Sequence, residues 1–467
     1  MDPVTTPDLA LHGVRSRRHF LRQLGAAGVA TMVGTGLIPL TRPIRAWAET
    51  GSEQSTVLVT ISLRGAADGL HIINPHGDDD YHRHRGEYGL SPGEFTDLDG
   101  FFGLHNSFAE LLPLWNAGEM SVVHAVGSHN ATRSHFVAQP NMDTAFANGG
   151  WLQRMIAASH FATGKAGVTI GDRISPPLNG PLGGAVVNTI QDTVETGISL
   201  SVVRPALEAL YGAATPALER AAVVGGLAAV DQISALDPMP GEFPSTNIGR
   251  DLREAASLIR ADIGIRAVAL DCGGWDHHED GLRRMENKGA DLAAGITAFM
   301  NDLGTDADRV VVCVNTEFGR AVRPNGSEGT DHGHGTAFMV FGKPLVDQGG
   351  GKVLVPGGWP GLGDDDLYEG QDLAVTTDFR SVFTELGVRH LGLDATSSVF
   401  PGFTPEPVGL LHRRGDVDGS GVVDMHDAQD VLDSSIRNGR TPVGDLDRDG
   451  DNDLIDGLLA TQKAAGQ

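Results

Sequence analysis

The sequence predicts an α/β protein in which helices cover both faces of a mainly parallel sheet, giving a three-layer domain. Two observations predict this fold class. Short apolar runs, several rich in β-branched residues, alternate along the chain with longer segments whose apolar residues recur at helical spacing. Polar residues gather directly after several of those runs, as they do at the carboxyl ends of parallel strands.

Five apolar runs are the predicted strands, because they are short and mostly apolar, as buried strands require. They span residues 56–63, 120–126, 265–270, 309–314 and 337–341. Two longer segments, 252–263 and 282–303, carry the helical pattern between them.

The chain divides into four predicted parts, and its composition changes abruptly where the last part begins. They are an export signal at 1–48, the α/β domain at 52–403, a linker with two prolines at 404–414, and an Asp-rich tail at 415–467.

The first part has the features of a twin-arginine export signal. Arg17 and Arg18 stand in the run SRRHFLR, an uncharged stretch covers 24–40, and Ala46–Ala48 forms an A-x-A-like cleavage site. An uncleaved membrane anchor is the alternative, although the stretch is rich in Gly and poor in large apolar side chains. We therefore expect a periplasmic, cell-surface or extracellular protein without a transmembrane segment in the mature chain.

Charge and cysteine content exclude two classes of protein. The chain has 60 acidic and 35 Lys and Arg residues, a formal charge of −25, which argues against nucleic acid as a partner. Cys272 and Cys313 are too few for a disulfide framework, and two buried thiols or one bridge remain.

The tail contains two twelve-residue calcium loops of the EF-hand type. Each has oxygen ligands at positions 1, 3, 5, 9 and 12, a backbone carbonyl at position 7, and Gly at position 6, where the loop turns sharply. Two loops in register predict two bound Ca²⁺ ions. The predicted calcium ligands are Asp416, Asp418, Ser420, Val422, Asp424, Asp427, Asp445, Asp447, Asp449, Asp451, Asp453 and Asp456.

This tail resembles a dockerin, which also carries two loop-helix repeats with Asp at position 12. The resemblance implies a small helical module that attaches the protein to a cohesin-like or cell-surface partner. At positions 10 and 11 this chain has Met425–His426 and Leu454–Ile455, where dockerins of cellulose-degrading assemblies have Ser/Thr pairs.

The main domain has carboxylates and imidazoles after its predicted strands, a pattern that indicates a divalent metal site. Asp, Glu and His without Cys suit Zn²⁺, Mn²⁺, Mg²⁺ or Ca²⁺. The candidate ligands are Asp68, Asp276, His278, Glu317, Asp331, His332 and His334.

Each candidate also has a plain structural interpretation. Asp68 could be a turn residue before Gly69, and Asp276 with His278 could begin a solvated helix. Glu317 could form a surface ion pair with Arg320. The group as a whole favours the metal site, because all its members follow or adjoin strands.

Five motifs in order resemble the bacterial family called Domain of Unknown Function 1501. They are LRGAADGL at 63–70, RSHF at 133–136, GWDHH at 274–278, TEFGR at 316–320 and GTDHG at 329–333. The chain departs from the family at Ala66, where relatives usually carry Gly.

That family is grouped with the alkaline phosphatase and sulfatase superfamily, so the resemblance implies an alkaline-phosphatase-like fold and a nucleophile at a helix start. Ser134 is the implied nucleophile, although it could instead be a helix N-cap. Arg133 is expected to hold non-bridging oxygens, and His135 to donate a proton or join the metal ligands.

The sequence thus predicts an exported, metal-dependent hydrolase of phosphate or sulfate esters. A carbohydrate-linked ester is suggested only by the association of dockerins with polysaccharide degradation. The alternative is a non-catalytic surface protein in which a degenerate hydrolase fold binds a ligand.

Overall fold

The computed structural model describes residues 56–159, 167–180, 185–187, 241–345, 350–393, 396–411 and Gln429. The predicted export signal and, apart from Gln429, the predicted calcium module lie outside these residues. No helix in the described part of the chain is both long and apolar enough to cross a membrane.

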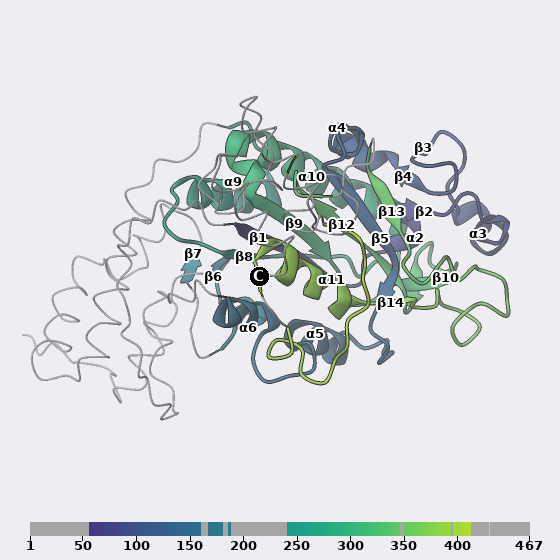
Figure 1. Cartoon of the computed structure of the whole chain (residues 1–467). Coiled ribbons are helices and arrows are strands. Elements are labelled where there is room, and N and C mark those ends of the chain that lie inside the picture. The colour runs from purple at the N-terminus through teal and green to yellow at the C-terminus, as the bar shows by residue number, and fades with distance from the viewer. Residues whose placement is uncertain are drawn as a thin grey trace, which may run out of the picture.

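A large twisted sheet forms the centre of the domain (Figure 1). In the described ranges its strands run in the order β13-β5-β12-β9-β1-β8-β6-β7, with β14 also paired to β5. The bounds are β1 Val57–Arg64, β5 Met120–Gly127, β6 Gly167–Ile170, β7 Ala185–Val187, β8 Ala267–Gly273, β9 Val310–Asn315, β12 Thr336–Phe341, β13 Lys352–Leu354 and β14 Thr377–Asp378.

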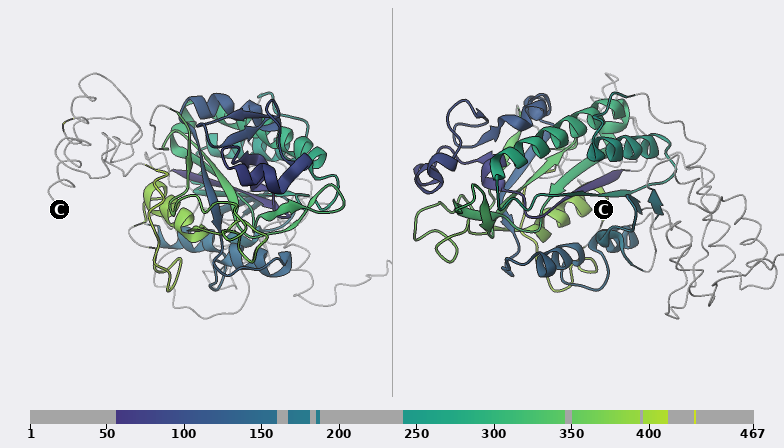
Figure 2. Two further views of the ribbon diagram at one scale, coloured as in Figure 1. Left: turned by 90° about the vertical axis from the view of Figure 1, so that its right-hand side faces the viewer. Right: turned by 180° about the vertical axis from the view of Figure 1, so that it is seen from behind.

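Helices cover both faces of this sheet, and Figure 2 shows the same layers from two further sides. One face carries α9 and α10, and the other carries α5, α6 and α11. The helices are α2 Gly69–Ile72, α3 Asp79–Arg85, α4 Leu112–Asn116, α5 His135–Thr144, α6 Trp151–Ala158, α9 Asn247–Arg260, α10 Gly281–Leu303 and α11 Phe379–Glu385.

The alternation of side chains along β1 explains why helices cover both faces of the sheet. Val57, Val59 and Ile61 of β1 pack in one core cluster with residues of α9 and α10, whereas Leu58 packs in a second cluster with residues of α6 and α11. Successive side chains of a strand point to opposite faces, so a fully apolar strand needs a cover on each face. The predicted three-layer α/β architecture is confirmed.

The sheet is mainly parallel, as predicted, but β12 is antiparallel to both of its neighbours, β5 and β9. This orientation matters for the site. The motif at 329–333 precedes β12, and the start of an antiparallel strand lies at the same edge as the ends of its neighbours. A segment before one strand therefore meets segments after β1, β5, β8 and β9.

Two small sheets flank this edge. The strands β10 (Arg320–Pro324) and β11 (Thr330–His332) pair with each other, and β2 (Ile73–Asn74), β4 (Gly103–His105) and β3 (Phe95–Asp97) form the other. Short 3-10 helices span Gly86–Tyr88, Asn106–Leu111, Pro176–Leu178 and Gly304–Arg309, and a π-helix spans Leu386–His390.

The five predicted strands and both predicted helices are confirmed, with ends that differ by a few residues. The largest difference is at α9, which begins at Asn247 because the Thr246 hydroxyl caps it by accepting the Gly249 N–H at 3.2 Å. Of the two cysteine alternatives, the structure has free thiols, with Cys313 buried.

Residues 404–411, which the sequence assigns to the linker, pack on the α/β domain. The carboxylate of Glu385 in α11 accepts N–H groups of Val408, Gly409 and Leu411 at 2.8–3.0 Å. Val408 and Leu411 are buried in the core cluster of that face. The domain therefore continues at least to Leu411, because this segment completes its apolar cover.

Candidate metal site

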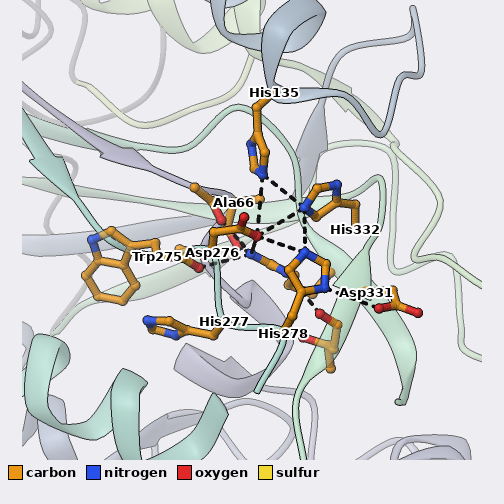
Figure 3. A network of polar contacts seen from close by, with 12 residues as sticks. Ala66, His135, Trp275, Asp276, His277, His278, Asp331 and His332 are labelled. Carbon is orange, nitrogen blue, oxygen red and sulfur yellow. Dashed lines mark hydrogen bonds and ion pairs between the residues drawn. The ribbon is translucent and has the colours of Figure 1, made fainter. Parts of the chain in front are cut away.

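Four polar side chains converge at the strand edge, from three different segments (Figure 3). His135 is the first residue of α5, which follows β5. Asp276 and His278 follow β8, and His332 ends β11, just before β12. The fold thus joins residues that are nearly two hundred positions apart in the sequence.

The cluster is tight. The Nε2 atom of His332 lies 2.9 Å from Nε2 of His135, 2.9 Å from Nε2 of His278 and 3.0 Å from Oδ1 of Asp276. The same Oδ1 lies 3.0 Å from Nε2 of His278 and 3.4 Å from Nε2 of His135. The ligand atoms of His135, Asp276 and His332 all lie within 4.8 Å of one another, and Nε2 of His278 adjoins this group through His332 and Asp276.

The other ring nitrogen of each imidazole faces a group that can only accept a hydrogen bond. The Nδ1–H of His332 donates to the backbone carbonyl of Arg133 at 2.7 Å. The Nδ1–H of His278 donates to Oδ1 of Asp331 at 3.2 Å, and Asp331 also accepts the side-chain amide of Asn325. These partners fix the tautomer in which Nε2 carries a lone pair.

Glu317 plays the same part for His135. Its Oε1 accepts the Nδ1–H of His135 at 2.7 Å, the amide of Gln139 at 2.8 Å and the N–H of Gly65 at 2.9 Å. Burial alone would raise the pKa of Glu317, but these hydrogen bonds outweigh it and lower that pKa to about 2. A permanently charged carboxylate thus orients His135, and raises the pKa of that imidazole above its usual value.

The donor set fits a metal ion. With Nδ1 protonated, the Nε2 lone pairs of His135 and His278 each face Nε2 of His332 at 2.9 Å, and a proton or a cation would satisfy them. In a tetrahedral zinc site with ligands at about 2.0–2.1 Å, neighbouring ligand atoms are roughly 3.3 Å apart, close to the spacing seen here. Three imidazoles and one carboxylate suit Zn²⁺ better than the harder Mg²⁺ or Ca²⁺.

Arg320 holds the segments of the site together. Its buried guanidinium donates to the carbonyls of Gly65 at 2.6 Å, Thr330 at 2.9 Å and Trp275 at 3.1 Å, and to Oδ1 of Asp276 at 2.7 Å. These atoms belong to the segments after β1 and β8 and to β11. Burial would raise the pKa of Asp276, but its hydrogen bonds to Arg320 and His332 leave it below the usual range.

Asp68 does not join the cluster. Its two carboxylate oxygens accept the Arg85 guanidinium at 2.7 and 3.0 Å, and Oδ2 lies 3.1 Å from Nδ1 of His71. Burial would raise the pKa of Asp68, but Arg85 and His71 outweigh it and lower that pKa. The predicted ligand role is replaced by a buried ion pair, which the sequence does not reveal because Arg85 and His71 stand in no recognisable motif.

His334 and Arg133 are also engaged elsewhere. The Nε2–H of His334 donates to the carbonyl of Ser128 at 2.8 Å. The Arg133 guanidinium pairs with the buried Asp372 and with Glu369, so it is not free to clamp an anion. Arg133 contributes through its backbone instead, as the acceptor for His332.

Ser134 precedes His135 at the N-cap of α5, and its side chain makes no capping hydrogen bond to the described residues. The Thr132 hydroxyl accepts the Ser134 N–H at 3.2 Å, which gives Thr132 a role in the turn. Ser134 is thus the N-cap residue of α5, as its plain interpretation has it, but its hydroxyl makes no capping hydrogen bond. The predicted ion pair between Glu317 and Arg320 is replaced by Glu317–His135 and Arg320–Asp276.

The family described as "Protein of unknown function (DUF1501)" matches residues 122–400, more than half of the chain. The chain belongs to the DUF1501 family. Its match spans β5 to the segment after α11 and so includes every member of the imidazole cluster. No curated protein matches this sequence.

Solved structures similar to this DUF1501 chain include three named proteins. Ps i-CgsB has a TM-score of 0.36 at 10% identity, with 75% of each chain covered. The PsFucS1 sulfatase from Pseudoalteromonas sp. has a TM-score of 0.34 at 9% identity, with 76% of this chain and 73% of that chain covered. The lipoteichoic acid synthase LtaP from Listeria monocytogenes has a TM-score of 0.29 at 10% identity, with 70% of this chain and 75% of that chain covered. These TM-scores and identities are too low to support a conclusion about the reaction of this chain.

Proposed function

We propose that this DUF1501 protein is a metal-dependent hydrolase of phosphate or sulfate esters. The observation that supports it is the cluster in which Nε2 of His332 lies 2.9–3.0 Å from Nε2 of His135, Nε2 of His278 and Oδ1 of Asp276. His135, Asp276, His278 and His332 would hold the ion, with Zn²⁺ the best fit. A bound ion would supply positive charge against a transferring phosphoryl or sulfuryl group and would lower the pKa of a nearby hydroxyl.

Ser134 is the proposed nucleophile, because its hydroxyl lacks a capping bond and it adjoins His135. Its Oγ would lose its proton and attack the phosphorus or sulfur atom, the bond to the alcohol oxygen would break, and that oxygen would take up the proton and leave as the alcohol. Water would then attack the same atom, restore the Ser134 hydroxyl and release inorganic phosphate or sulfate. An attacking water in a single step is the alternative.

The experiment is a panel of aryl phosphates and aryl sulfates, tested with the protein as purified, after chelation, and after readdition of Zn²⁺. Turnover that disappears on chelation and returns with Zn²⁺ supports the proposal. Replacing Ser134 by Ala distinguishes the two nucleophiles, since a water mechanism keeps most of the activity. A protein that binds metal but turns over no ester in the panel contradicts the hydrolase and favours the non-catalytic alternative.

We also propose, from the sequence alone, export by the twin-arginine route and a tail that holds two Ca²⁺ ions and attaches the protein to a cohesin-like or cell-surface partner. Replacing Arg17 and Arg18 by Lys should leave the protein in the cytoplasm, and normal export of that variant would refute the route. Titrating the full chain with Ca²⁺ should show two fewer tail ions when Asp416 and Asp445 are both replaced by Ala.

A further inference from the structure

The segment that links β5 to α5 carries three groups of the site. Its residues, 128–134, belong to neither a helix nor a strand. The carbonyl of Arg133 accepts the Nδ1–H of His332 at 2.7 Å, and Ser134 and His135 follow it directly. A shift of this one segment would therefore move the acceptor of one imidazole, a second imidazole and the proposed nucleophile together.

The side chain of Arg133 is anchored on a buried carboxylate. Its Nε–H and Nη2–H both donate to Oδ2 of Asp372, at 2.8 and 2.5 Å, and its Nη1–H donates to Glu369 at 2.7 Å. Asp372 is buried with 0% of its surface exposed, whereas the Glu369 side chain is 53% exposed. Because solvent screens an exposed ion pair, Asp372 is the partner that can fix the guanidinium in one place.

The turn that carries Asp372 is tied to the strands around His332. The backbone carbonyls on either side of Asp372 accept N–H groups from Val322 in β10 and from Gly335 directly before β12, each at 2.9 Å. The strand β10 pairs with β11, whose last residue is His332. Asp372 and His332 therefore share one support, and the Asp372–Arg133 pair connects that support to the start of α5.

This carboxylate would be a costly feature if its only role were stability. Its Oδ1 is buried and has no hydrogen-bond partner among the described residues. Burying a charged oxygen costs free energy unless hydrogen bonds replace those of water. Apolar side chains of similar volume often replace a buried ion pair without loss of stability. Fixing the geometry of Arg133 is a role that apolar side chains could not take.

We propose that Asp372 is a positioning residue of the metal site. Through the Arg133 side chain it holds the carbonyl that orients His332 and the start of α5 that carries His135. The inference rests on the metal site of the proposed function. It predicts that removing the Asp372 charge weakens metal binding although every proposed ligand stays in the chain.

The test measures the Zn²⁺ affinity of the full chain by competition with a chromophoric chelator. Asp372→Asn keeps the size of the side chain and should weaken Zn²⁺ binding about tenfold, the lower end for groups that orient metal ligands. Glu369→Gln changes only the exposed partner of the same guanidinium, so it is the matched control and should bind Zn²⁺ as the parent does. The visible absorption of Co²⁺ bound in place of Zn²⁺ depends on ligand geometry, and it should change in Asp372→Asn but not in Glu369→Gln.

A double variant, Arg133→Met with Asp372→Leu, separates positioning from stability. Because it replaces the ion pair by apolar groups, the metal-free chain should have a free energy of unfolding equal to that of the parent or higher. Its Zn²⁺ affinity should still fall about tenfold, since no anchored side chain then fixes the carbonyl of residue 133.

Equal Zn²⁺ affinity in the parent, Asp372→Asn and the double variant would overturn the proposal. A loss of affinity in Asp372→Asn that the double variant restores together with stability would also overturn it, because the role would then be structural. Metal affinity needs no turnover, so it separates this inference from the hydrolase. If the parent binds Zn²⁺ more tightly than both variants but hydrolyses no ester, the hydrolase fails and the positioning role stands.

Discussion

At the scale of single residues, His332 is central, because its Nε2 contacts every other member of the cluster within 3.0 Å. The sequence predicts His332, Asp276 and His278 as ligands from their positions beside strands. For His135 the sequence leaves two roles open, proton donor or metal ligand. Nothing in the local sequence shows that the start of α5 will face β11. Asp68 could not be excluded by sequence, because its partner Arg85 is 17 positions away.

Glu317 tests whether an orienting carboxylate governs the metal site. Glu317→Gln keeps an acceptor for the Nδ1–H of His135 but removes the charge, and should lower metal affinity by about 10–100-fold. Competition with a chromophoric chelator measures this affinity. The exposed Glu87→Gln is the control and should bind metal as the parent does.

The metal-free Glu317→Gln protein should also be less stable than the metal-free parent, because the folded chain stabilises the charged form of Glu317. An unchanged metal affinity would show that Glu317 does not act through His135.

At the scale of elements, the site depends on close approach between the segments after β1 and β8. Gly65 has φ 120°, and a side chain there would place Cβ 2.5 Å from the backbone nitrogen of Asp276. Ala66 also has a positive φ of 61°, a conformation that favours Gly, and its methyl packs with Ala138 and Phe318. The sequence indicates that these segments are neighbours, but the antiparallel β12 and the bonds of Arg320 depend on pairings that no local pattern encodes.

Gly65→Ala should therefore destabilise the protein by roughly 2 kcal/mol or more and disrupt the metal site, because it combines an unfavourable φ with a backbone clash. Gly273→Ala is a matched control at the same edge, since its Cβ would meet nothing within 4 Å. Denaturant unfolding and metal affinity of both variants are the measurements. Equal effects of the two substitutions would mean that the close approach of these segments is unimportant.

At the scale of the whole molecule, the two apolar layers and the parallel order of most strands are predictable, because apolar runs on both faces require cover on both faces. The packing of residues 404–411 is not, since prolines and the lack of periodicity suggest a linker. Buried polar groups are likewise visible only in the structure. His124 is one: the Nε2–H donates to the carbonyl of Ile73 at 2.9 Å, and Nδ1 accepts the Ala125 N–H.

This burial predicts a pH dependence of stability. Burial lowers the pKa of His124 to about 4, from an unfolded value of about 6.5. Between these values the unfolded chain binds the additional proton, so the free energy of unfolding falls as the pH falls from 6.5 to 4. The loss is at most about 1.4 kcal/mol per pH unit and on the order of 3 kcal/mol in total.

His124→Gln keeps a donor for Ile73 and cannot titrate, so its unfolding free energy should fall less steeply near pH 5. Buried His105, with its pKa also lowered to about 4, should preserve part of the slope. Urea unfolding at several pH values measures it, with His82→Gln as the exposed control. Parallel slopes for parent and His124→Gln would contradict the assignment.

The metal content of the purified full chain tests the central claim most directly. Elemental analysis after dialysis against metal-free buffer and loading with one equivalent of Zn²⁺ should find about one zinc per chain in the parent. His332→Ala, which removes the nitrogen common to the cluster contacts, should retain at least tenfold less, while His82→Gln should match the parent. Equal zinc in parent and His332→Ala, or none in either, would show that these imidazoles do not form a metal site.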